Sequence, residues 1–101
     1  MVHHPYRKPP PAPESLPPLP IDAGLWQAIA ETLKLSPQLG RVTECVVRGM
    51  CDKQIADALG IKKSTLRTHF DRIFMRTGAR GRMAIMRKVL TVSHQIKSTK
   101  H

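Results

Sequence analysis

Cysteines are scarce in this chain of 101 residues and long apolar runs are absent, and each of these features excludes a class of protein. The two cysteines, Cys45 and Cys51, form no CxxC pair, and the 5 histidines are scattered, which argues against a structural zinc site. No apolar run is long enough to cross a membrane, and no apolar leader follows the first residues. We therefore expect a cytoplasmic protein with reduced thiols, no membrane contact, and no metal or other cofactor.

Residues that would support catalysis are missing as well. The chain has no paired acid and base, no glycine-rich loop to cradle a phosphate and no cluster of metal ligands. His69 has no nucleophile or carboxylate at an interpretable spacing, so we expect it to be structural. The sequence therefore predicts that the protein is not an enzyme.

Basic residues, in contrast, are abundant and unevenly distributed. The chain holds 17 lysines and arginines against 7 acidic residues, for a formal charge of +10. Through Lys34 the balance is zero, and from Leu35 onward 14 basic residues face 4 acidic ones. A basic excess confined to one part of the chain favours a polyanionic partner, although a merely soluble basic surface is the alternative.

Proline is concentrated at the N-terminus, where 8 of the 9 prolines fall within residues 1–20. Such a segment cannot hold a helix or a sheet ladder, so we expect a disordered or polyproline II tail over residues 1–20. It is either a flexible tail or a docking motif for a proline-binding domain. Ordered structure is expected from about Ile21.

Apolar residues recur at helical spacing through the rest of the chain, with no competing strand pattern, and predict an all-α fold. An accessory helix is expected within residues 21–34, capped by Asp22, with Trp26 as a packing anchor. Its apolar stripe must be covered by the following domain or by a second subunit. That domain is expected over residues 35–97, followed by a disordered end at residues 98–101. Its helices should begin at Ser36-Pro37 and stop at Gly49, run from about 53 to 59 under an Asp52 cap, run from about 63 to 77, and continue from about 82 toward 96.

The segment from Lys53 to His69 has the pattern of a DNA-reading helix-turn-helix. A short amphipathic run ends at Gly60, and a second helical pattern with a basic exposed face follows it. Arg67 lies one turn inside that second helix, where its guanidinium can fork onto a guanine edge, whereas Lys63 lies at the start and should meet phosphate first.

From Leu35 to about Leu90 the chain resembles the LuxR/GerE-type helix-turn-helix domain, which also occurs at the end of NarL- and FixJ-like response regulators. The motifs that carry this resemblance occur in order and at matching spacing: Leu35-Ser36-Pro37, Gly49, Lys53-Gln54-Ile55-Ala56-Asp57-Ala58-Leu59-Gly60-Ile61, Ser64-Thr65-Leu66-Arg67-Thr68-His69 and Ile73-Phe74-Met75-Arg76-Thr77-Gly78-Ala79-Arg80-Gly81-Arg82. Together they form a specific signal, whereas each alone would be weak.

The resemblance implies a tetrahelical domain that binds double-stranded DNA, usually as a dimer joined through its last helix. It implies that Arg67, Thr68 and Asp71 face base edges. Candidate phosphate contacts lie around the start of the same helix and, for one arginine, further along it: Lys62, Lys63, Ser64, Thr65 and Arg72. Candidate dimer contacts on the accessory and last helices are Trp26, Ile29, Ile85, Met86, Val89 and Leu90.

Three positions depart from the family pattern. Leu39 stands where the family usually has an acidic residue, so apolar packing is expected to replace an ionic contact. Lys62 replaces a customary serine N-cap and puts a cation at a helix end that prefers anions. Asp71 is acidic on a face that should approach phosphates, where it either accepts from a cytosine amino group or pairs with Arg67 or Arg72.

Two functions are compatible with these features of the sequence. The first is a sequence-specific transcription regulator that binds DNA, expected to act as a homodimer and to be controlled by abundance, dimerisation or a partner protein. The second uses the same fold as a protein-interaction module that binds a transcription regulator or an RNA polymerase subunit. Replacement of Arg67, Lys63 and Arg72 discriminates between them, because only the first function needs these side chains.

Overall fold

The computed structural model describes residues 16–98, which form five helices and no strand. They are α1 (Ala23–Thr32), α2 (Pro37–Val47), α3 (Asp52–Leu59), α4 (Lys63–Thr77) and α5 (Arg82–Ser98). The predicted all-α fold is therefore confirmed. No helix within residues 16–98 is long and apolar enough to span a membrane.

The starts of the first two helices are fixed by side-chain caps that the sequence predicted. The Asp22 carboxylate accepts a hydrogen bond from the backbone N–H of Leu25 at 3.0 Å. The Ser36 hydroxyl accepts one from the N–H of Leu39 at 3.2 Å, and Pro37 occupies the first turn. Each cap satisfies an N–H that the helix itself leaves without a partner.

The predicted cap of α3 is wrong by one residue. The N-cap is Cys51, whose backbone N–H donates to the side-chain oxygen of Gln54 at 2.8 Å. Because Gln54 reaches back in this way, the helix already begins at Asp52. The Asp52 carboxylate therefore lies in the first turn, where the helix dipole favours a negative charge.

Glycines end the third and fourth helices as expected. Gly60 and Gly78 adopt left-handed conformations with φ of 67° and 77°, which L-residues with a side chain rarely adopt. Two residues end α2. The helix ends at Val47, Arg48 is its C-cap, and Gly49 then turns the chain with φ of 86°.

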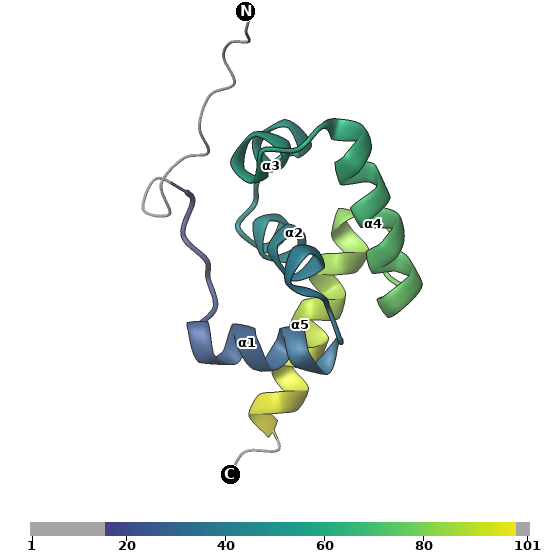
Figure 1. Ribbon diagram of the computed structural model, residues 1–101. Coiled ribbons are helices and arrows are strands. Elements are labelled where there is room, and N and C mark those ends of the chain that lie inside the picture. The colour runs from purple at the N-terminus through teal and green to yellow at the C-terminus, as the bar shows by residue number, and fades with distance from the viewer. Residues whose placement is uncertain (1–15, 99–101) are drawn as a thin grey trace, which may run out of the picture.

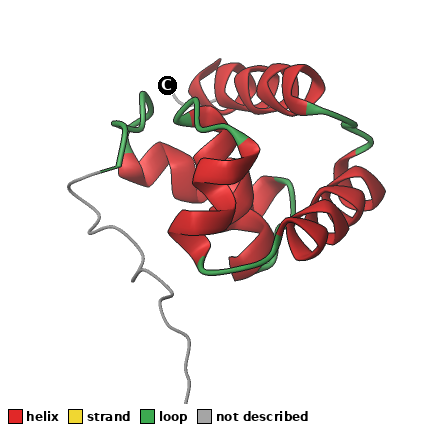
Figure 2. Cartoon of the chain, turned by 90° about the horizontal axis from the view of Figure 1, so that it is seen from above, coloured by secondary structure: helices red, strands yellow, loops and turns green. Residues whose placement is uncertain are grey.

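Every helix contributes buried side chains to the core, and Figure 1 shows how the helices are arranged. α5 packs against α1 and α2, and α4 packs against α2 and α3. Figure 2 shows the same arrangement from above. The most deeply buried side chains include Ile29, Val42, Ile55, Leu66, Ile73 and Val89. Cys45 is buried as expected, and burial raises the pKa of its thiol.

The accessory helix α1 is part of this single core. Ile29 at its centre is 0 % exposed, and α1 packs on α5 of the same chain. Its apolar stripe is thus covered by the domain that follows it, which is one of the two expected alternatives. Leu39 is also buried, in agreement with its expected apolar packing.

Ordered contacts begin before the predicted start at Ile21. Leu16 and Leu19 pack against the core, and Nη1 of Arg48 donates to the carbonyl of Pro17 at 2.5 Å. Arg48 is held by Glu44 at 2.7 Å, so it can satisfy a carbonyl that the proline-rich segment cannot pair itself. Residues 16–20 therefore do not belong to a disordered tail; the predictions for residues 1–15 and 99–101 lie outside the described residues.

Three of the expected dimer contacts are buried within one chain. Ile29, Ile85 and Val89 are 0 %, 2 % and 0 % exposed, so they have no surface to offer a second subunit in this fold. The sequence pattern marks them correctly as apolar, but periodicity cannot tell which neighbour covers an apolar stripe.

Candidate nucleic-acid interface

The helix-turn-helix is built from α3, the turn at Gly60 and α4. The N–H of Ile61 donates to the carbonyl of Ala56 at 2.9 Å, which closes the turn as α3 ends. Ile55 in α3 and Leu66 in α4 are both fully buried, at 0 % and 1 % exposure. This packing fixes the direction in which α4 leaves the turn.

The inner face of α4 is apolar and holds the helix on the domain. Leu66, His69 and Ile73 are all buried there, at spacings of three and four residues. His69 is 7 % exposed and lies among these core residues, and its buried Nδ1 has no hydrogen-bond partner within residues 16–98.

The outer face of α4 carries the predicted base-reading residues. Arg67, Thr68 and Asp71 are all exposed, on the side opposite Leu66 and Ile73. The Thr68 hydroxyl donates to the carbonyl of Ser64 at 3.2 Å, within the same helix. Its proton is thereby occupied, so the side chain offers its methyl group and an acceptor oxygen to a partner.

The start of α4 is exposed and basic. Lys62 occupies the N-cap position and makes no side-chain capping bond, as its lack of a hydroxyl predicts. Lys63 and Ser64 are exposed, and Thr65 is half-buried. Because no side chain caps the helix, its first backbone N–H groups remain for water or an anion.

Asp71 is paired with neither of its expected partners. Its carboxylate lies 3.9 Å from Nη1 of Arg80, and both side chains are mostly exposed. The Arg80 guanidinium lies over the Phe74 ring, 4.0 Å from its centre, and this stacking keeps the arginine beside α4. The prediction that Asp71 pairs with Arg67 or Arg72 is therefore wrong.

A basic hollow beside α4 was not anticipated from the sequence. It has a volume of about 530 Å³ and lies between α4, the start of α3 and the loop before α5. Its lining consists of Asp52, Lys63, Leu66, Arg67, Phe70, Asp71, Arg80, Gly81 and Arg82.

Arg80 and Arg82 are the two cations of this hollow that sequence reasoning missed. Arg82 pairs with Asp52 at 2.7 Å and so ties the start of α5 to the start of α3. Both arginines stand in the family-like motif over residues 73–82, after the end of α4, and the repeated charge around Gly81 was the available signal. Their placement depends on the turn after Gly78, which spacing alone does not reveal.

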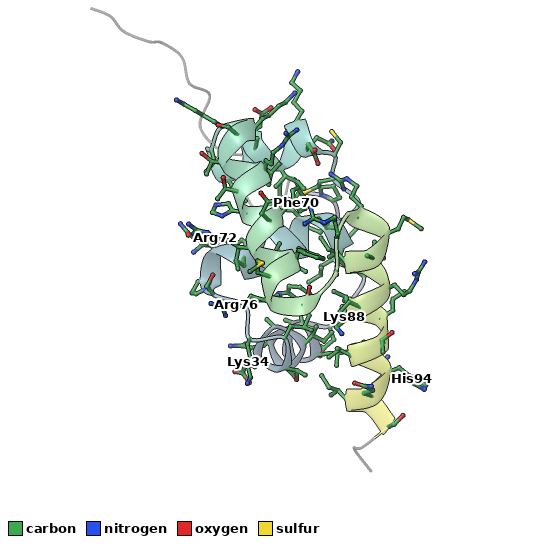
Figure 3. The ribbon with its side chains drawn as sticks, turned by 90° about the vertical axis from the view of Figure 1, so that its right-hand side faces the viewer. Lys34, Phe70, Arg72, Arg76, Lys88 and His94 are labelled. Atoms are coloured by element: carbon green, nitrogen blue, oxygen red, sulfur yellow. The ribbon has the colours of Figure 1, made fainter. Side chains whose placement is uncertain are left out.

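α4 therefore has an exposed, mostly polar outer face, interrupted by the apolar side chain of Met75, between two basic flanks. Lys63 and Arg80 lie on the flank that borders the hollow. Arg72 and Arg76 lie on the other flank, where Figure 3 shows them along one edge of the molecule. Such an arrangement can present hydrogen-bonding groups to base edges and cations to the phosphates on either side.

Comparison with protein-family models supports the same interpretation. Residues 33–89 match the model described as GerE: Bacterial regulatory proteins, luxR family. The match spans more than half of the chain and includes α2, α3, α4 and the first part of α5. Searches of curated proteins and of solved structures gave no significant match.

Proposed function

The chain belongs to the luxR family of bacterial regulatory proteins, whose helix-turn-helix domain binds DNA, and from this premise we propose that it is a sequence-specific transcription regulator. In this proposal α4 enters the major groove of double-stranded DNA, and the protein acts in the cytoplasm. One observation carries the proposal most: the outer face of α4 is exposed and mostly polar, with Met75 as an exposed apolar side chain on it, while the inner face is buried in the core. That is the geometry a recognition helix needs.

The side chains of α4 divide into two roles. Arg67, Thr68 and Asp71 read base edges, with Arg67 as a fork for guanine and Thr68 suited to the thymine methyl group. Lys62, Lys63, Ser64, Thr65 and Arg72 meet phosphates. These contacts fix the register of the helix on the duplex but carry no sequence information themselves.

The position of Asp71 supports a reading role over a purely repulsive one. Its pairing with Arg80 places a cation beside the carboxylate, which reduces the repulsion that phosphates would otherwise exert. The carboxylate still has lone pairs free for a cytosine amino group, because a single contact at 3.9 Å does not saturate it.

A homodimer joined through α5 completes the proposal. Met83 and Leu90 are 75 % and 58 % exposed, and they lie two turns apart on one face of α5. Large apolar side chains exposed in this way favour a second copy as partner. Of the residues expected at the interface, the exposed Leu90 and the half-buried Met86 and Trp26 remain candidates.

Selection from a random pool of duplexes tests the proposal. The purified protein is incubated with the pool at near-physiological salt and with excess competitor DNA, because low salt would let the net charge imitate recognition. We expect a palindromic motif whose half-sites repeat at about one helical turn, roughly 10 base pairs. Recovery of no motif would contradict the proposal and favour the protein-interaction module.

A further inference from the structure

The basic flank of α4 away from the hollow continues beyond the helix itself. Arg72 and Arg76 are four residues apart, so they lie on the same side of α4. Lys34, in the loop between α1 and α2, is exposed and follows them along the same edge of the molecule (Figure 3). The three cations come from two elements that are distant in the sequence.

A hydrogen bond holds these two elements together. Nη1 of Arg76 donates to the backbone carbonyl of Lys34 at 2.6 Å. Arg76 thereby links the last turn of the recognition helix to the end of the accessory helix. The link fixes the backbone of Lys34 and leaves its ammonium group exposed beside α4.

Lys34 has an unusual backbone for a lysine. With φ of 56° it is the only residue other than glycine with a positive φ among residues 16–98. The N–H of Leu35 donates to Ala30 and that of Lys34 to Glu31, both at 3.0 Å, which is the pairing of a Schellman motif. The left-handed position of that motif is usually glycine, because a side chain is disfavoured there. A lysine in this disfavoured conformation therefore suggests that its side chain has a function.

The charge of this edge is not neutralised within the described chain. Arg80 and Arg82 on the opposite flank face Asp71 and Asp52, but Lys34, Arg72 and Arg76 form no salt bridge with any carboxylate of residues 16–98. Three clustered cations repel one another, and a polyanion would relieve that repulsion.

We propose that Lys34 binds a DNA phosphate, and that α1 and Arg76 position it for this contact. A helix in the major groove has one sugar-phosphate backbone on each side, and the flank of Lys34, Arg72 and Arg76 faces one of them. The accessory helix thus serves DNA binding as well as the core. This inference rests on the proposed function, since it extends the same interface.

The substitution Lys34→Gly tests the inference without disturbing the fold. Glycine removes the ammonium group and adopts the same positive φ freely, so the thermal stability should be retained or raised. The affinity for the selected duplex is measured across a range of salt concentrations. We expect the slope of log K against log salt to become shallower by about 0.9, and the affinity at about 0.15 M salt to fall about fivefold.

Two further variants complete the experiment. Lys97→Ala, in the last turn of α5, makes the same charge change away from α4 and should leave the slope unchanged. Lys34→Arg keeps a cation and should preserve the slope of the unaltered protein.

The outcomes separate the inference from the proposed function. If the unaltered protein selects no duplex, the proposed function fails. If it does select one and Lys34→Gly retains the full salt slope, the phosphate contact of Lys34 is wrong. If Lys34→Gly lowers the melting temperature and leaves the salt slope unchanged, the ammonium group of Lys34 only stabilises the negative end of the α1 dipole and does not bind DNA.

Discussion

Arg67 and Lys63 lie one turn apart on α4, and their different positions predict different consequences of replacement. Arg67→Ala should weaken binding to the selected duplex by about 1–3 kcal/mol and reduce the preference for one base pair, because a bidentate contact to a base edge is lost. Lys63→Ala should weaken all sequences about equally and flatten the salt dependence. Titrations of each protein variant with the selected duplex and with its single-base variants distinguish the loss of a base contact from the loss of a phosphate contact. An equal, sequence-independent loss in both variants would count against Arg67 as a base reader.

Asp71 gives a second prediction at the same face. Asp71→Asn removes a negative charge but keeps the shape, so binding to unrelated duplexes should strengthen while discrimination at one base pair declines. The melting temperature should hardly change, because the pair with Arg80 is mostly exposed and such pairs contribute about 0–1 kcal/mol. Competition between selected and unrelated duplexes measures both effects. A uniform fall in affinity would argue that the carboxylate only orients its neighbours.

The two cysteines should differ in reactivity. Burial raises the pKa of the Cys45 thiol, with a smaller effect from the nearby Glu44 carboxylate, and Cys51 is exposed. A raised pKa leaves less of the reactive thiolate at about pH 8, and burial blocks access. A disulfide reagent at that pH should therefore modify one thiol quickly and the second only on unfolding. Rapid reaction of both thiols in the folded protein would contradict this assignment.

Among the elements, α1 lies entirely before the segment that matches the family model, yet it contributes to the core. Ile29→Ala should lower the free energy of unfolding by about 2–5 kcal/mol, because the side chain is fully buried and its removal leaves a cavity. Gln27→Ala, exposed on the same helix, should change stability little. Urea unfolding measures both. A cost below about 1 kcal/mol for Ile29→Ala would mean that α1 is dispensable.

The helix boundaries show how much of the fold could be predicted from the sequence. Periodicity and capping residues predicted the ends of α1, α2 and α4 accurately. Asp22 and Ser36 act through local hydrogen bonds, and Gly78 acts through its backbone preference. The start of α3 was missed by one residue because the side chain of Gln54 accepts from the N–H of Cys51, which makes Cys51 the N-cap in place of Asp52.

The candidate site was predictable in part. The exposed face of α4 follows from helical spacing, since Arg67, Thr68 and Asp71 fall opposite the buried residues. The contacts of Arg76 with Lys34 and of Arg80 with Asp71 join residues from different elements. They depend on how the helices pack, and no local pattern encodes that packing.

For the molecule as a whole, the exposed stripe of α5 predicts self-association. Leu90→Lys should shift a dimer toward monomer without loss of folding, because Leu90 is 58 % exposed. Thr91→Lys adds the same charge at an exposed neighbouring position and should have a smaller effect. Sedimentation equilibrium over a range of concentrations measures the association. If the Leu90→Lys variant remained dimeric, the interface would lie elsewhere.

The central claim is that α4 enters the groove, and NMR mapping of a selected duplex on the isotope-labelled protein tests it most directly. We expect the largest chemical-shift changes in the backbone amides from Lys62 to Arg72, with Lys34 also affected, and little change along the exposed face of α5. The largest changes on α1 and α2, with α4 unaffected, would contradict the account and place the binding surface elsewhere.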